Sequence, residues 1–220
     1  MEFKLFHFGE DISQDELIAE LENINNNQDV SAYIVQLPLP GHIDSNTIIE
    51  SIDPLKDADG FHPVNQGKVM IWDKSGFAPC TPAGIMELIE YYKVDLNGKK
   101  VCILGRSNIV WKPLTMLMIN AGATVSVCNS RTLDISRYTR DADIVVCATG
   151  QAGLLTWDML DNKAIIIDVG FSVVDGVIHG DADTQSLLEA WHIVTPVPWG
   201  VWPMTVAMLL SNTLRAHESN

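Results

Sequence analysis

Apolar and polar residues follow different patterns on the two sides of residue 98. Before it, the apolar segments 3–8 and 31–37 predict strands. The amphipathic stretch between them predicts a helix, in which Ser13 caps the first turn and Glu16 completes a capping box. The first part of the chain is therefore expected to mix strands and helices.

Three further features belong to this first part. Residues 45–51 predict a short helix, whereas the polar stretch 53–76 is rich in turn residues. Thr81 and Pro82 then open a helix that reaches about Lys93, because proline suits the first helical position.

The second part of the chain, after the turn at Asn97-Gly98, alternates short apolar runs with helical segments. This alternation is typical of a doubly wound parallel sheet, so the fold class is α/β. The predicted strands are 99–105, 123–128, 143–148 and 164–170, and the predicted helices are 111–121 and about 203–217.

Composition limits the classes of function. The 220 residues are 47% apolar, which fits a globular protein of one large or two small domains. The net charge of −14 disfavours general binding to nucleic acid or to anionic membranes, so an anionic ligand needs a local cluster of donors. No segment resembles a signal peptide and no apolar run reaches ~18 residues, so a soluble, cytoplasmic protein is expected.

The four cysteines do not indicate disulfides or a metal site. Cys102, Cys128 and Cys147 lie in or beside predicted strands, where a small core residue is the expected role. Cys80 lies in a Pro-Cys-Thr-Pro loop, and its role stays open. Since metal-ligand spacings are absent and the histidines do not cluster, we expect no metal.

The sequence GRSNIV, from Gly105 to Val110, follows a strand and precedes a helix, where such sheets bind nucleotide phosphates. It is not a GxGxxG motif, so on its own a dinucleotide site and an ordinary turn are equally good interpretations. The next strand ends near Ser130 and Arg131, without an acid to hold a ribose 2′-hydroxyl. With Arg106, these donors suit a 2′-phosphate and favour NADP over NAD.

Three other segments contain candidate site residues. Gln36, inside an apolar run, is either structurally satisfied or directed into a cleft. Asp57 and Asp59 would share one face of an extended segment and meet a ligand, or form a solvated acidic turn; the later positions of a calcium loop are missing. The proline-rich loop 195–205 can wall a pocket, and its X-Pro bonds are candidates for the cis form.

Several motifs occur in one order along residues 1–216: VQLPLPGHID, PLKDADGFHPVNQGK, PCTPAGIMELI, GKKVCILGRSNIV, ATVSVCNSRT, ADIVVCATG, IIIDVG and TPVP with PMTVAML. Together they resemble the bifunctional methylenetetrahydrofolate dehydrogenase/cyclohydrolase, or FolD, family. The resemblance implies an enzyme that oxidises 5,10-methylenetetrahydrofolate with NADP and hydrolyses the methenyl product to 10-formyltetrahydrofolate. It also implies a bilobal homodimer with a cleft, and we expect a folate lobe of 1–95 plus 203–220 and an NADP lobe of 96–202.

The resemblance assigns roles to residues that match the family's motifs. Gln36 matches a glutamine that supports the catalytic lysine, and Asp59 matches the aspartate that holds the pterin ring. The matching cofactor positions are Gly105, Arg106, Ser107, Ser130, Arg131, Thr149 and Phe171, and the matching positions on the substrate side are Gln36, Asp59, Pro198, Gly200 and Thr205. Phe171 departs from the family, which usually has isoleucine there.

Two other departures bear on activity. The family's catalytic lysine lies in a Tyr-x-x-x-Lys segment, and no tyrosine of this chain has a lysine four residues later. We expect that segment, with a strand and a helix, to belong upstream of Met1. Lys4 lies in a predicted strand and is no substitute, so the chain as written is expected to be inactive.

The second departure is tryptophan. Trp111, Trp199 and Trp202 stand where the family has glycine, and Trp72, Trp157 and Trp191 fall at loop positions that glycine would also suit. We expect indoles at the first three positions to crowd the cofactor turn and the folate loop, and we expect strain from positive φ angles there. A gene in which UGA encodes glycine, translated with tryptophan, would explain all six.

Two alternatives to the enzyme stay open. One is a non-catalytic paralogue that binds folate or NADP, which applies if the tryptophans are genuine. The other is an unrelated NADP-dependent reductase, but such a protein needs neither VQLPLP nor KDADG.

Overall fold

A computed structural model describes residues 2–105 and 110–219. Its centre is a five-stranded sheet in the order β2-β1-β3-β4-β7, in which every neighbouring pair is parallel. The α/β class and the four strands expected between 99 and 170 are therefore confirmed. The strands are β1 (Lys100–Leu104), β2 (Thr124–Cys128), β3 (Ile144–Cys147), β4 (Ile165–Asp168) and β7 (Ile193–Val194).

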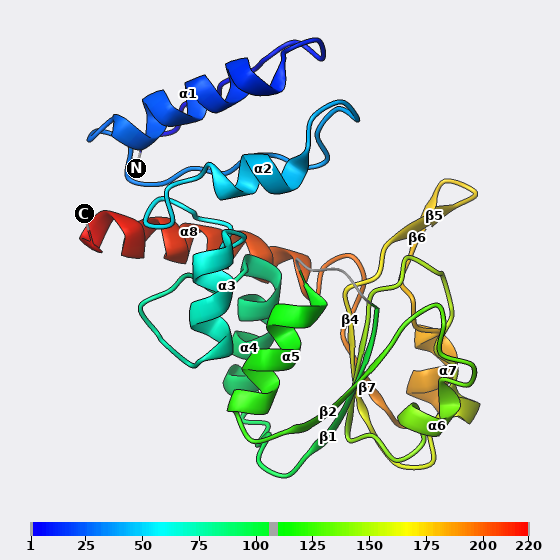
Figure 1. The fold of residues 1–220 in the computed structure, drawn as a ribbon. Coiled ribbons are helices and arrows are strands. Elements are labelled where there is room, and N and C mark those ends of the chain that lie inside the picture. Colours follow the sequence, from blue (N-terminus) through cyan, green and yellow to red (C-terminus); the bar gives the residue numbers. More distant parts are fainter. Residues whose placement is uncertain (1, 106–109, 220) are drawn as a thin grey trace.

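Helices cover both faces of this sheet (Figure 1). Because β1 and β3 are apolar almost throughout, they need cover on each side. On one face lie α4 (Cys80–Tyr91) and α5 (Trp111–Asn120), whose Ile85, Ile89, Leu114 and Met118 share a core with Ile103 and Val146. On the other lie α6 (Ser136–Thr139), α7 (Thr184–Glu189) and the 3-10 turn η1 (Trp157–Met159), around a core that includes Cys102 and Cys147.

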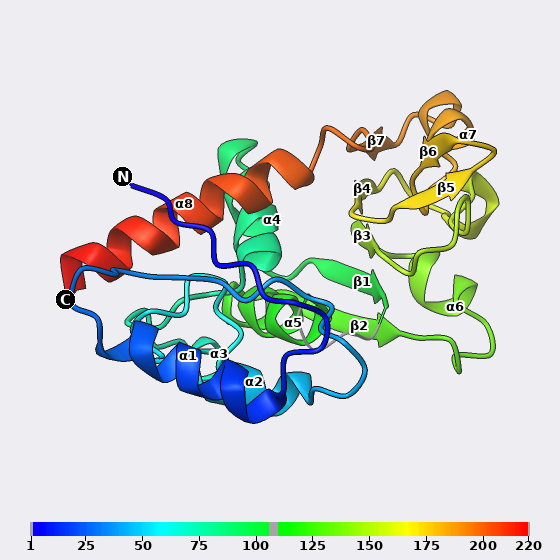
Figure 2. The same ribbon diagram turned by 90° about the horizontal axis from the view of Figure 1, so that it is seen from above.

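The N-terminal part has a core of its own. Helix α1 (Gln14–Asn26) begins with the predicted capping box between Ser13 and Glu16. It packs against α2 (Ser45–Glu50), the short helix that the sequence predicts, through Leu17, Leu21, Ile24, Ile43 and Ile48. The long C-terminal helix α8 (Trp202–Ser219) leaves the sheet and runs along α4 toward this part (Figure 2).

Several expected elements differ from the structure. Neither 3–8 nor 31–37 is a strand; the second makes only an isolated bridge, between Tyr33 and Asp57. Among the described residues neither segment has a strand alongside it, and an apolar run without a partner cannot form a ladder. Helix α4 begins at Cys80, with Pro79 as its N-cap, so Pro82 is its third residue rather than its first.

Elements α3, α6, α7, η1, β5, β6 and β7 were not predicted. Of these, α3 and the β5–β6 hairpin have a clear sequence signal. Helix α3 (Pro63–Met70) lies within the stretch expected to be turns; Pro63 is its first residue and the His62 ring accepts from the Val64 N–H at 3.1 Å. Strands β5 (Ser172–Val174) and β6 (Val177–His179) form a hairpin around Asp175 and Gly176, whose φ angles are 51° and 78°. Asp-Gly between valines is a strong hairpin signal.

None of the helices within residues 2–105 and 110–219 is long and apolar enough to cross a membrane.

Candidate functional site

The carboxyl edge of the parallel sheet is the place where this topology binds a ligand. The chain runs from β1 to β2 on one side and then to β3 on the other, so the strand order reverses between β1 and β3. A crevice outside the carboxyl ends opens at such a point. Gly105 follows β1, Thr149 follows β3 and Phe171 follows β4, so the topology brings these three predicted residues to one edge.

Gly105 has a backbone that suits glycine. Its φ is 145°, and its N–H donates to the Cys128 carbonyl at 2.8 Å. Arg106 and Ser107 lie outside the described residues. Ser130 and Arg131 are exposed beyond the end of β2, in a turn where the Arg131 N–H donates to the Asn129 side chain at 2.9 Å.

Thr149 is held by a residue that the sequence did not single out. Oδ2 of Asp181 accepts hydrogen bonds from the Thr149 N–H, from the Thr149 hydroxyl at 3.0 Å and from the Gly150 N–H at 3.1 Å. Asp181 is fully buried, and within residues 2–105 and 110–219 its Oδ1 has no hydrogen-bond partner. This carboxylate fixes the turn after β3, and the sequence carries no signal for it because the partners are far apart along the chain.

Asp168, at the end of β4, lies beside Asp181. It accepts from the N–H groups of Gly170, Asp181 and Ala182 at 2.8, 3.2 and 2.8 Å. Burial raises the pKa of the Asp168 carboxyl, and the nearby Asp181 acts in the same direction. The same crowding makes Gly170 necessary, because a Cβ there would meet the Asp181 carboxyl carbon at 2.1 Å.

The residues predicted to meet folate centre on Asp59. It is half-buried, and the Cys80 thiol lies 3.9 Å from its Oδ1. Cys80 itself is buried and is linked to α8 through the Asn212 amide, which also donates to the Ala58 and Ala78 carbonyls at 2.9 and 3.0 Å. Desolvation, with a smaller contribution from the charge of Asp57, raises the pKa of Asp59 to about 6. Asp59 is thus a carboxyl poised near neutral pH.

Asp57 does not share the role of Asp59. The segment is a turn rather than an extended strand, and Asp57 is buried, accepting from the Phe61 and His62 N–H groups and from the Asn65 amide. Lys56, next to it, is also buried and donates to carbonyls at the end of α1. Asp57 and Lys56 therefore hold the turn that presents Asp59.

Gln36 differs from the expectation of a buried glutamine. It is exposed, and its amide donates to the Leu37 carbonyl at 2.9 Å. The apolar run around Gln36 predicts a buried strand, but in the structure that run forms no ladder with another strand.

The proline-rich loop between β7 and α8 connects the two sides. Its Val197–Pro198 bond is cis, as the sequence allowed, and Leu37–Pro38 is cis as well. A Cβ at Gly200 would meet the Pro196 oxygen at 2.5 Å. Just beyond, the hydroxyl of Thr205 in α8 lies 3.0 Å from that of Thr81 in α4.

Two departures from the family pattern contact each other at this loop. The rings of Phe171 and Trp202 lie 5.0 Å apart between centroids. Trp199 is 78% exposed and Trp202 38%, so neither indole is packed in the core.

Trp111 occupies the turn after β1. A Cβ built on Gly105 would meet its Nε1 at 2.2 Å, so the indole lies directly against that glycine, between β1 and the first turn of α5. Trp111 is 3% exposed and belongs to the core. The sequence predicts instead an indole that crowds the cofactor turn outside the core. Close helix–strand approach after the first strand is what lets such folds hold a pyrophosphate, and here the indole occupies the space beside Gly105.

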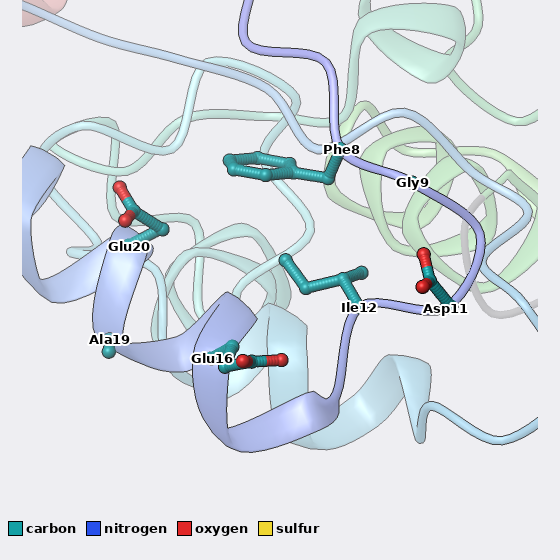
Figure 3. A pocket seen from close by; sticks show the side chains of 7 residues that line it. All are labelled: Phe8, Gly9, Asp11, Ile12, Glu16, Ala19 and Glu20. Carbon is teal, nitrogen blue, oxygen red and sulfur yellow. The ribbon is translucent and has the colours of Figure 1, made fainter.

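A separate pocket lies between the N-terminal segment and α1 (Figure 3). Phe8 and Ile12 give it an apolar wall, and Asp11, Glu16 and Glu20 are its charged lining residues. Since no basic side chain is among the residues that line it, it does not suit an anionic folate or dinucleotide.

Comparison with known proteins identifies the family. Residues 79–220 match the model of the tetrahydrofolate dehydrogenase/cyclohydrolase NAD(P)-binding domain, and residues 1–59 match that of the catalytic domain. The bifunctional protein FolD of Hydrogenobaculum is 50% identical over 96% of this chain and 76% of that protein. That of Helicobacter acinonychis is 48% identical over 99% of this chain and 75% of that protein.

Solved structures agree. The bifunctional FolD enzyme of Campylobacter jejuni superposes with a TM-score of 0.95 at 46% identity, covering 97% of this chain and 76% of that one. FolD of Trypanosoma brucei, solved with NADP and an inhibitor, gives 0.88 at 37% identity, over 96% and 74%. The chain therefore belongs to the tetrahydrofolate dehydrogenase/cyclohydrolase family and carries its NAD(P)-binding domain.

Proposed function

We propose that this protein serves one-carbon folate metabolism by the two reactions of its family. It oxidises 5,10-methylenetetrahydrofolate to the methenyl form with NADP, and it hydrolyses that product to 10-formyltetrahydrofolate. The observation that carries the proposal is Asp59, a half-buried carboxyl with a raised pKa that the turn 56–62 and α8 hold in place. An ionised carboxylate there can accept hydrogen bonds from the N–H groups of a pterin.

The remaining site residues divide between the two ligands. Gln36, Pro198, Gly200 and Thr205 belong to the folate side with Asp59. Gly105, Arg106, Ser107, Ser130, Arg131, Thr149 and Phe171 belong to the cofactor side. We assign Asp181 to the same side as a positioning residue, because it fixes the backbone of Thr149 and Gly150.

The lobes and the assembly are part of this proposal. The folate lobe comprises 1–95 plus 203–220 and the NADP lobe 96–202, with the cleft between them. The protein works as a homodimer in the cytoplasm, and its net charge of −14 argues against nucleic acid as a partner. Sedimentation velocity of the native protein, with a dimer as the expected species, tests the assembly.

A second candidate function is a paralogue that binds folate or NADP without turnover. Trp111 favours it, because the indole occupies the space beside Gly105, at the turn where such folds hold a pyrophosphate. Identification of the residue at position 111 in the native protein separates the two functions.

The experiment for the proposed function compares two proteins. The printed 220-residue chain, expressed alone, should neither oxidise methylenetetrahydrofolate nor hydrolyse the methenyl form, because general acid–base catalysis contributes about 10²–10⁴-fold and no Tyr-x-x-x-Lys occurs in it. The protein purified from its own cells should do both. A native protein that binds both ligands but turns neither over supports the paralogue, and turnover by the printed chain shows that another residue supplies the proton transfer.

A further inference from the structure

Among the described residues, four helices end in the same hydrogen-bonded turn. After the C-cap residue, one N–H donates three residues back and the next N–H donates five residues back, as in a Schellman motif. After α5 the two donors are Gly122 and Ala123, at 2.9 and 3.0 Å, and after α4 they are Lys93 and Val94, at 2.9 and 3.0 Å. After α3 they are Trp72 and Asp73, at 3.2 and 2.8 Å. After α7 they are Trp191 and His192, at 3.0 Å each.

The first donor of each turn has a left-handed backbone. The φ angles are 89° at Gly122, 55° at Lys93, 62° at Trp72 and 66° at Trp191. Glycine adopts this conformation without cost, whereas a Cβ is crowded against the following carbonyl. Two tryptophans therefore stand at the helix-end position that glycine prefers most strongly.

Burial does not compensate these two tryptophans. Trp72 is 46% exposed and Trp191 is 81% exposed. The Trp72 ring has a contact with the Lys74 ammonium at 5.5 Å, which is a weak attraction at an exposed site. The Trp191 ring is mostly in water and gains little from its position, and the Trp72 ring is only partly shielded.

Trp111 gives an independent observation of the same kind. Its backbone is helical, but its indole is packed against Gly105 in the turn where the family's fold needs close approach. Three tryptophans on different elements thus occupy places that suit a residue without a side chain. One cause, a codon that the cell translates as glycine, explains all three tryptophans. Three separate substitutions would each need neighbouring residues that relieve the strain or the crowding.

We propose that the gene encodes glycine at positions 72, 111 and 191, and that the printed tryptophans stand for UGA codons that its cell translates as glycine. A reassigned codon acts throughout a gene, so positions 157, 199 and 202 also carry glycine. Only the argument for position 111 rests on the proposed function; those for positions 72 and 191 rest on backbone geometry alone.

Mass spectrometry of peptides from the protein purified from its own cells tests the proposal directly. Peptides that span positions 72, 111 and 191 should have the masses of glycine, and the gene should have UGA at all six positions. UGG codons, or peptides with the masses of tryptophan, would overturn it. Glycine peptides from a protein without dehydrogenase activity would refute the proposed function and leave this inference standing.

Thermal unfolding of the printed chain gives a second test. Trp72→Gly and Trp191→Gly should each raise Tm by about 2–4 °C, because relief of one left-handed residue shifts a domain of this size by that amount. Lys93→Gly is the matched positive control and should also raise Tm. Trp157→Gly is the negative control, because position 157 has no positive φ. A fall in Tm for both helix-end tryptophan variants, with a rise for Lys93→Gly, contradicts the proposal.

Discussion

The residues proposed for folate and those proposed for the cofactor carry motifs of the same family but differ in how well they fit their surroundings. Around Asp59, the Asn212 amide and the Cys80 thiol link the turn to α8, and Thr81 meets Thr205 across two helices. Around Gly105, the Trp111 indole fills the space between β1 and α5. These contacts near Asp59 include hydrogen bonds of ordinary length, whereas the crowding beside Gly105 comes from a tryptophan where the family pattern has glycine. The difference shows that, among the described residues of the two groups, this crowding has its source in that tryptophan.

The largest expected effect comes from Trp111→Gly in the otherwise printed chain. It should strengthen NADP binding by roughly 10- to 2,000-fold, since relief of an overpacked turn contributes about 1–3 kcal/mol and a recovered backbone hydrogen bond to the phosphate about 0.5–1.5 kcal/mol. Titration calorimetry with NADP and with a folate, separately, measures the change.

The control for this variant is Trp157→Gly, which removes an exposed indole away from the turn. It should leave NADP binding unchanged. Folate binding should be the same in both variants, and a gain in folate affinity with Trp111→Gly would break the distinction between the two sides.

Arg106→Ala should give the next largest effect, measured in the protein with glycine at position 111. Loss of a charged hydrogen bond to the 2′-phosphate should weaken NADP binding by about 1.5–3 kcal/mol, or roughly 10- to 150-fold. NAD lacks that phosphate, so its binding should change much less. Arg140→Ala is a matched control, because Arg140 pairs with Asp161 at 2.9 Å. Equal losses for NADP and NAD would refute the role of Arg106.

How much of the structure around these residues the sequence predicts depends on how far apart along the chain the interacting residues lie. Strands β1, β3 and β4 are apolar runs with local signals, and the Ser13–Glu16 capping box spans four residues. Gln36 was misjudged because burial depends on neighbours that the sequence does not place beside it. Asp181 could not be found, because its partners at 149 and 150 are brought to it only by the crossing of the chain between β3 and β6.

The tryptophans also show that a role set by the fold is not visible in a motif. Strain was expected at positions 111, 199 and 202, where the family pattern has glycine, but the positive φ angles occur at Trp72 and Trp191. Motif comparison detects glycines that approach a ligand. It does not detect glycines that end a helix, because that role depends on where the helix stops, which the sequence reasoning had not placed for α3 and α7.

The smallest expected effect, and the one that tests the folate side alone, concerns Asp59→Asn. At pH 7.5 the amide cannot replace an ionised carboxylate as acceptor for pterin N–H groups, so folate binding should fall by roughly 10- to 100-fold. NADP binding should not change. In the unsubstituted protein, folate binding should weaken as the pH falls through about 6, because protonation removes the negative charge that strengthens the hydrogen bonds from the pterin.

Stability should respond to the same substitution with the opposite sign. The pKa of Asp59 is raised in the folded protein to about 6, so the folded state binds more protons than the unfolded state between about pH 4 and pH 6. Ionised Asp59 therefore costs stability above pH 6, and that cost disappears as the pH falls toward 4. Asp59→Asn should raise the free energy of unfolding at pH 7.5 by on the order of 1–3 kcal/mol and leave it nearly unchanged at pH 4.

Urea unfolding at the two pH values measures the difference. Asp53→Asn is a matched control on an aspartate before the same turn, and a gain that is equal at both pH values would show that burial of the Asp59 charge is not the cause.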